Sequence, residues 1–370
     1  MRVLDVALAV AGGIVVILTV LSAIVTVVVP RGVPVRLTRT VFLFSRKLFE
    51  LRGVVFRHDY EKRDRAMALY APVTLVALAF VWLVCVLAGF TAIFHALISD
   101  VSWEGAFEVS GSSLVTLGFV SVHGSGQYMA AFTEAGLGLL LLALLITYLP
   151  TMYAAFSRRE ALVTRTSISA GTPPSPWAFI ERYYRIAGFD RLEAHVWVPW
   201  TAGFVDIEES HTSLGALALF RSPQPHRSWV TASGCVLDTA ALMQSSVDGY
   251  DSSAGQLTMR AGFMALRAVA DYFRIPHNPD PSPDDPISIA RDEWEGVLDD
   301  LAAIGVPIAA DRDQAWRDFV GWRVNYDAVV LGLADFTMAP YAPWSSDRSP
   351  VLGTGSAGKG RGSGILGVWR

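Results

Sequence analysis

The sequence predicts an all-α membrane protein in which three transmembrane helices and one re-entrant loop are followed by an α-helical cytosolic domain. Of the 370 residues, 52% are hydrophobic, which is more than soluble domains usually carry. Three apolar runs, each long enough to cross a hydrocarbon core of about 30 Å, lie at Val6–Val29, Ala71–Leu97 and Thr133–Phe156. After Arg159, helical patterns separated by turns rich in Pro and Asp replace these runs, without an alternating strand pattern of any length.

The first apolar run predicts a transmembrane helix within residues 1–30. A cleaved signal peptide is the alternative, because only Arg2 precedes Val6–Val29 as a positive charge. The run is longer than the apolar part of a signal peptide, and the Val-Val-Pro-Arg sequence at its end is not a small-residue cleavage site. We therefore expect the run to be retained.

A basic segment, residues 31–69, predicts the orientation of the chain. Arg and Lys are dense from Arg31 to Arg65, and no further Lys or Arg occurs before Arg158. Because basic loops favour the cytoplasm, we expect a multi-pass protein of the cell membrane with its N-terminus outside and its C-terminal domain in the cytoplasm. Apolar residues from Leu37 to Val55 recur at helical spacing, which predicts an amphipathic helix at the inner membrane surface. The irregular spacing of its arginines argues against a voltage sensor.

Residues 70–157 predict a pore module. Its expected parts are an outer helix at 70–98, a pore helix at 104–115, a filter at 116–120 and an inner helix at 130–157. Non-helical backbone at membrane depth is tolerated only where it is buried in protein or lines a wet cavity. Such a strip can aim its carbonyl oxygens at an ion, and glycine supplies the backbone freedom that this needs.

The filter tetrapeptide carries a family resemblance. Thr116-Leu117-Gly118-Phe119 resembles the start of a potassium-channel filter of the T-x-G-[YF]-G type. The stretch from Glu134 to Glu160 resembles the inner helix of bacterial ion-transport-2 channels, and the stretch from Glu208 to Thr239 is similar to the cytosolic part of bacterial potassium-channel-like proteins. The resemblance implies a homotetramer around a central pore for passive cation flux, potassium first, with a cytosolic domain that gates or assembles it.

The chain departs from the family pattern at the outer end of the filter. Val120 and Ser121 stand where the family has a second glycine and usually an aspartate. A β-branched residue does not easily take the conformation that glycine allows, so the outermost carbonyl ring is expected to differ. Two alternatives stay open: a non-selective or even anion-conducting pore, and a non-conducting membrane sensor or scaffold on the same fold.

Two further groups of residues are expected to shape the pore. The mouth is predicted at Glu104, Glu108 and Ser121, whose acids either concentrate cations or simply solvate an extracellular turn. Gly136 and Gly138 permit close helix packing or a bend, and Pro150 removes a backbone hydrogen bond and should kink the inner helix. The inner gate is predicted at these residues together with Thr147 and Tyr148.

The C-terminal half predicts a linker at 158–176, a helical domain at 177–342 and a disordered Gly/Ser-rich tail at 343–370. The helices expected in the domain are Ala178–Ile186, Ile207–Arg221, Trp229–Ser246, Leu257–Arg274, Ser288–Ala303 and Gln314–Met338. Ser288 is the expected N-cap of its helix.

Metal sites find little support in the sequence. The two cysteines, Cys85 and Cys235, fall in different predicted compartments and form no Cys-x-x-Cys pair. Glu208 and His211 lie one helical turn apart and could share a metal or ligand, but no third ligand is evident nearby. Asp280, Asp284 and Asp285 lack the spacing and glycine of an EF-hand loop.

Enzyme activity also lacks support, because no Ser/His/Asp, Cys/His or paired-carboxylate arrangement stands out. Gly353–Lys359 fits a nucleotide-binding G-x-x-x-x-G-K pattern only formally, since Gly360 replaces the Ser or Thr and no strand precedes it. We expect no cofactor beyond the permeant monovalent ion, with potassium first, and no nucleic-acid partner. The expected partners are the lipid bilayer, further copies of the chain and an unidentified cytosolic ligand.

Overall fold

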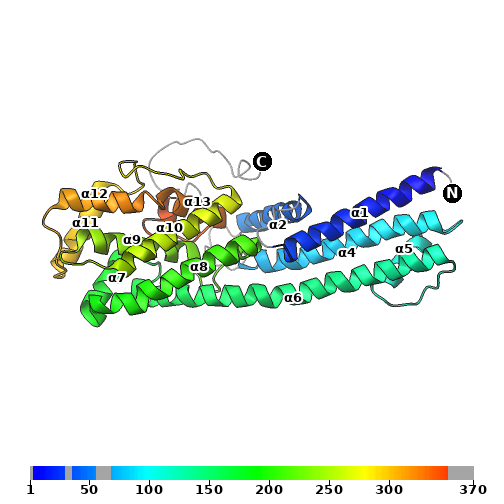
Figure 1. The fold of residues 1–370 in the computed structure, drawn as a ribbon, viewed down its shortest axis with the longest axis horizontal. Coiled ribbons are helices and arrows are strands. Elements are labelled where there is room, and N and C mark those ends of the chain that lie inside the picture. The colour runs from blue at the N-terminus through cyan, green and yellow to red at the C-terminus, as the bar shows by residue number, and fades with distance from the viewer. Residues whose placement is uncertain (1–2, 30–35, 56–67, 349–370) are drawn as a thin grey trace. The chain divides into compact units, whose positions relative to one another are not determined.

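The computed structural model describes residues 3–29, 36–55 and 68–348, most of which are helical (Figure 1). These residues contain no strand and a single isolated bridge, between Val247 and Ile308. Contacts divide the chain into two units, with the boundary between Ala154 and Ala155 inside one long helix. We call them the membrane unit and the helical domain. The predicted all-α fold is confirmed for the described residues.

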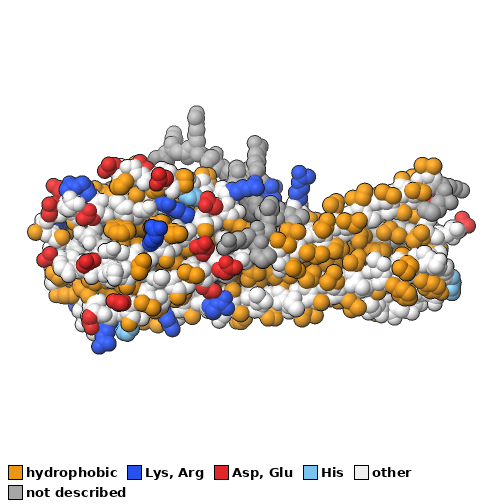
Figure 2. Space-filling model, in the orientation of Figure 1, with side chains coloured by type: hydrophobic (Ala, Val, Ile, Leu, Met, Phe, Trp, Pro, Cys, Tyr) orange, Lys and Arg blue, Asp and Glu red, His pale blue; other side chains and the backbone are white. Residues whose placement is uncertain are grey.

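Among the residues that the structure describes, three helices are long and apolar enough to cross a membrane: α1 (Val3–Val27), α4 (Tyr70–Leu97) and α6 (Ser125–Ala170). They coincide with the three predicted spans. Figure 2 shows hydrophobic side chains over most of the visible surface of the membrane unit, whereas charged side chains gather on the helical domain. The protein is therefore a membrane protein.

Glycines bring α1 and α4 into direct backbone contact. A Cβ on Gly12 would lie 2.4 Å from the carbonyl oxygen of Gly89, and a Cβ on Gly89 would lie 2.8 Å from that of Gly12. Within a bilayer, helix association depends on such close packing, because lipid tails are as apolar as the side chains. The two glycines thus determine where the helices cross.

The predicted amphipathic helix is present as α2 (Arg36–Val55). It is tied to α1 through the hydroxyl groups of Thr38 and Thr26, 2.9 Å apart, and to α4 through Tyr70, whose hydroxyl donates to the Phe42 carbonyl at 3.0 Å. The rest of the predicted basic segment, at 31–35 and 56–67, lies outside the described residues.

The helical domain is arranged around one buried helix. Its helices are α7 (Pro176–Arg182), α8 (Val198–Ser213), α9 (Trp229–Ser246), α10 (Ser253–Phe273), α11 (Arg291–Ala303), α12 (Arg312–Arg323) and α13 (Asp327–Thr337). Every residue of α9 except Gln244 is buried, and α7, α10, α12 and α13 pack against it. A helix that is apolar or small on all sides forms the centre of a core.

The predicted helix Gln314–Met338 is two helices, because α12 ends at Arg323 and α13 begins at Asp327. The side-chain amide of Asn325 donates to the Gly321 carbonyl at 2.9 Å and so satisfies a carbonyl at the end of α12. Short polar side chains compete with the helix in this way. The predicted single helix is therefore wrong at this point.

Ser288 is not the N-cap of α11. Its N–H and its hydroxyl both donate to the Asp327 carboxylate, at 2.9 and 2.6 Å. The capping position is Ala290, which offers no side-chain hydrogen bond, and the helix begins at Arg291. Ser288 therefore binds a residue far along the chain, Asp327, instead of capping the helix that follows it.

Two predicted segment boundaries also shift. Helix α6 continues to Ala170, so it covers most of the predicted linker at 158–176. The predicted tail at 343–370 begins too early, because Trp344 and Ser346 are buried and Ser346–Arg348 forms a 3-10 turn. Residues 349–370, including the G-x-x-x-x-G-K pattern, lie outside the described residues.

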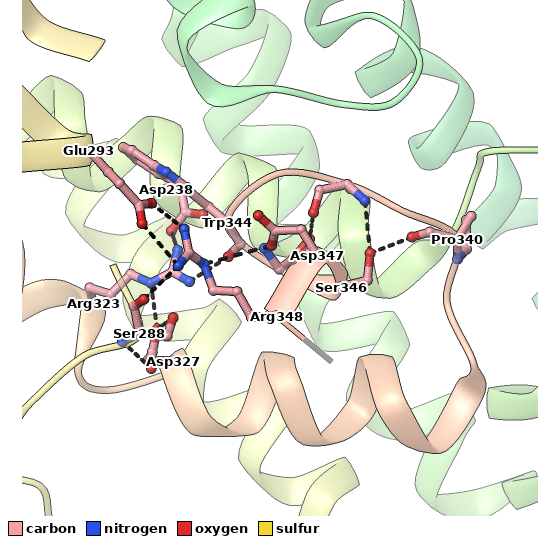
Figure 3. A network of polar contacts seen from close by, with 12 residues as sticks. Asp238, Ser288, Glu293, Arg323, Asp327, Pro340, Trp344, Ser346, Asp347 and Arg348 are labelled. Carbon is pink, nitrogen blue, oxygen red and sulfur yellow. Dashed lines mark hydrogen bonds and ion pairs between the residues drawn. The ribbon is translucent and has the colours of Figure 1, made fainter. Parts of the chain in front are cut away.

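A buried ionic network connects several helices of the helical domain (Figure 3). Arg323, which is not exposed, donates to the carboxylates of Asp238 and Asp327 and to the Trp344 carbonyl. The Tyr326 hydroxyl donates to the same Asp238 oxygen at 2.8 Å. Burial raises the pKa of Asp238 to about 6 although the Arg323 guanidinium opposes the shift, and because this value lies below 7 the carboxyl is mostly ionised at neutral pH. The network joins α9, α12 and α13 to the C-terminal segment.

Candidate functional site

A short helix, α5 (Trp103–Leu114), occupies the predicted pore-helix position to within one residue. It begins at Ser102, whose hydroxyl accepts the Gly105 N–H at 3.0 Å, and Glu104 in its first turn suits the helix dipole. Its buried face packs on α4. Local capping signals therefore explain where this helix starts.

Two contacts fix α5 against α6. The Ser110 hydroxyl lies 2.5 Å from Glu134 Oε1, and a Cβ on Gly138 would lie 2.2 Å from the Leu114 carbonyl oxygen. Ser110 and Leu114 are one turn apart on α5, as Glu134 and Gly138 are on α6. Because both pairs progress in the same order, the two helices run in the same direction where they touch.

The chain then returns to the end from which α5 started. The side-chain amide of Gln127 donates to the carbonyl of Leu97, the last residue of α4, at 3.4 Å, and Gln127 Oε1 accepts the His123 N–H at 3.1 Å. Gly138 lies about three turns, roughly 16 Å, further along α6. The residues between Leu114 and Ser125 therefore run back over a similar length.

The strip formed by residues 116–120 alternates in backbone handedness. Thr116 and Gly118 have φ of 55° and 71°, in the left-handed region, whereas Leu117 and Phe119 do not have positive φ. A left-handed threonine is uncommon and needs support from its surroundings. Val120 does not continue the alternation, because its φ is not positive.

Ser112 supplies much of that support. Its carbonyl accepts the N–H groups of Leu117, at 2.9 Å, and Gly118, at 3.4 Å, and its hydroxyl accepts the Val120 N–H at 3.2 Å. Among the hydrogen bonds of the described residues, none is accepted by a carbonyl of residues 116–120. The strip is thus held through its N–H groups, while its carbonyl oxygens are left for other partners. Sequence reasoning missed Ser112, although a polar residue beside the strip was a usable signal.

Side chains of the strip have little cover within one chain. Leu117 and Phe119 are 66% and 65% exposed, and Val120 is half-buried. The predicted mouth residues, Glu104, Glu108 and Ser121, are also exposed. No hydrogen bond or ion pair joins these three side chains within the described part of the chain.

The two glycines of the predicted gate differ in their surroundings. Gly138 contacts Leu114, whereas a Cβ on Gly136 would meet no atom within 4 Å. Within the described chain, Gly138 packs closely against α5, whereas no described atom packs against Gly136. Tyr148 is buried, the Thr147 hydroxyl donates to the Ala143 carbonyl of its own helix at 3.0 Å, and α6 continues through Pro150. The kink at Pro150 and the gate itself stay predictions.

His211, which the sequence pairs with Glu208, instead contacts buried Arg159, and among the described residues no hydrogen bond of that arrangement involves the Glu208 side chain. His211 Nε2 lies 3.2 Å from the guanidinium of buried Arg159, which also donates to the carbonyls of Leu217 and Phe220. A guanidinium only donates, so Nε2 accepts and the ring proton sits on Nδ1, 3.1 Å from the Ser210 hydroxyl. The described residues hold no group of three ligands for a metal.

His211 should make stability depend on pH. Burial and the neighbouring guanidinium lower the pKa of His211 well below 6.5, so below that pH the unfolded chain takes up a proton that the folded chain refuses. Stability should fall by up to about 1.4 kcal/mol per pH unit below 6.5. Thermal unfolding of the wild type and His211→Gln, from about pH 7.5 to 5.5, checks this. Gln can still accept from Arg159, and parallel pH profiles would contradict the assignment.

The helical domain also contains a cavity of about 740 Å³ beside α12. Aromatic side chains and carboxylates contribute to its lining: Tyr250, Trp316, Trp322, Asp251, Asp284 and Asp318. Its volume is that of a small-molecule site. The unidentified cytosolic ligand stays a prediction, and this cavity is large enough to hold one.

Comparison of the chain with protein-family models, with curated proteins and with solved structures gives no match. The resemblance of residues 116–119 to a channel filter stays a prediction. Inference about function therefore depends on the geometry of α5, the strip and α6.

Proposed function

We propose that this chain is one subunit of a homotetrameric cation channel, with potassium as the first candidate ion and residues 116–120 as its filter. The observation that carries the proposal is the hydrogen bonding of the strip. Its N–H groups are held from behind, largely by Ser112, and its carbonyls accept no bond within the described chain. Oxygens in this state are suited to replace the water around a cation.

Self-association follows from the same geometry. A single strip cannot surround an ion, so several copies must place their strips around one axis, and closed symmetry is the usual solution. Exposed apolar side chains on α6, such as Phe132, Leu139 and Ile146, offer surface for lipid or for neighbouring subunits. The absence of Lys and Arg from 66 to 157 supports a cytoplasmic helical domain and an external N-terminus.

Ion flux into liposomes that contain the purified protein tests the proposal. Thr116→Ala and Gly118→Ala should both reduce the flux to background. The first removes a hydroxyl oxygen from the strip, and the second puts a Cβ on a residue whose φ is positive. Thr133→Ala and Gly126→Ala are matched controls in α6 and should leave it unchanged. A wild type that passes no ion would instead support a non-conducting sensor or scaffold.

Loss of strict potassium selectivity is the second candidate, and Val120 favours it. This residue lacks the positive φ of Thr116 and Gly118, so the alternation of the strip ends one position early. Reversal potentials in asymmetric KCl and NaCl separate a selective pore from a non-selective or anion-conducting one. Val120→Gly should increase potassium preference if the outer position limits selectivity.

A further inference from the structure

Glu134 is a fully buried carboxyl in the apolar part of α6. Its Oε1 lies 2.5 Å from the Ser110 hydroxyl, and its Oε2 is buried with no hydrogen-bond partner among the described residues. The sequence places no Lys or Arg between 66 and 157, so neither of these permanently charged side chains is available from this stretch to neutralise it. Ionisable residues at such positions are costly and usually have a function.

The other titratable side chains on α4 and α5 do not neutralise the Glu134 carboxyl. On α4, His95 stacks on Trp103 with ring centroids 4.2 Å apart, and Cys85 is a free, half-buried thiol. On α5, Glu104 and Glu108 are exposed. Within the described residues, no hydrogen bond or ion pair joins any of these side chains to the Glu134 carboxyl. The two glutamates are acids and would not offset its charge.

The hydrogen bonds of Ser110 indicate that the Glu134 carboxyl carries a proton. The Ser110 hydroxyl lies 3.1 Å from the Leu87 carbonyl as well as 2.5 Å from Glu134 Oε1. A serine has one hydrogen, so it can donate to only one of these two oxygens. If Glu134 is a neutral acid, Oε1–H donates to the Ser110 oxygen and the Ser110 hydroxyl donates to the Leu87 carbonyl, so both hydroxyl hydrogens have an acceptor and Oε2, unpartnered among the described residues, carries no charge. An ionised Glu134 would leave a buried charge with at most one donor.

We propose that Glu134 is a positioning residue that is held as a neutral carboxylic acid and links α4, α5 and α6 behind the strip. Ser110 lies two residues before Ser112, the residue whose carbonyl and hydroxyl hold Leu117 and Val120. Ionisation at alkaline pH requires Glu134 to gain water or move, and this displaces α5 and the strip. Conduction is then lost as pH rises; that consequence rests on the proposed channel function, whereas the protonation state does not.

Infrared spectroscopy of the full chain in lipid nanodiscs at about pH 7 tests the protonation. The wild-type minus Glu134→Gln difference spectrum should lose the carbonyl band of a protonated acid, and Ser110→Ala should shift that band. Glu108→Gln, which changes an exposed glutamate of α5, should remove a carboxylate band instead. Loss of a carboxylate band in Glu134→Gln would overturn the proposal.

Flux measurements test the positioning role. Wild-type flux should fall roughly tenfold between about pH 7 and pH 10, a factor equivalent to one buried hydrogen bond, whereas Glu134→Gln should keep wild-type flux at both pH values. A Glu134→Gln protein with the same alkaline loss, or with no flux at neutral pH, overturns this role. A wild type without flux rejects the channel function, while the infrared result still decides the state of Glu134.

Discussion

Replacing Arg323 with methionine is expected to destabilise the helical domain by about 3–5 kcal/mol. Arg323 is completely buried, and its removal leaves the carboxylates of Asp238 and Asp327 without their cation. Methionine fills a similar volume, so the cost comes from the uncompensated charges and from the lost bond to the Trp344 carbonyl. Denaturant unfolding followed by tryptophan fluorescence measures the loss.

Arg317 provides the control, because it lies on the same helix and is exposed. Arg317→Met should change stability by no more than about 0.5 kcal/mol. Adding Asp238→Asn to Arg323→Met should recover part of the loss, because it removes one of the two unpaired charges. Equal losses in Arg317→Met and Arg323→Met would refute a special role for the buried network.

The spans and the short helix could be predicted because their signals are local. Apolar runs of sufficient length mark α1, α4 and α6, and the expected pore helix at 104–115 differs from α5 by one residue at each end. The Thr-x-Gly pattern likewise locates a non-helical strip at 116–118, where the structure has positive φ values.

Contacts between distant residues could not be predicted in this way. Ser110 and Glu134 are 24 residues apart, and Arg159 and His211 are 52 apart. Spacing along one helix cannot identify such partners, which is why His211 suggested a metal or ligand site with Glu208. The same limit explains Ser288, whose actual partner is 39 residues away at Asp327.

The largest effect in the membrane unit is expected for Gly138→Val. A Cβ at this position would lie 2.2 Å from the Leu114 carbonyl oxygen and 3.1 Å from a methyl carbon of the same residue, so α5 and α6 must separate. Forcing backbone apart in a packed region typically costs about 1–3 kcal/mol and can cost more. Thermal unfolding of the detergent-solubilised protein should show a lower midpoint, and ion flux should fall because the strip follows directly after Leu114.

Gly136→Val separates packing within the chain from other effects of the substitution. It adds the same side chain to the same helix two residues earlier, where a Cβ meets nothing within 4 Å, so the midpoint should stay close to that of the wild type. If Gly136→Val unfolds normally but loses flux or assembly, that glycine faces a neighbouring subunit or the conduction path. If both variants unfold at the wild-type temperature, α5 does not pack on α6 through Gly138. The inference that this packing holds the strip in place would then be wrong.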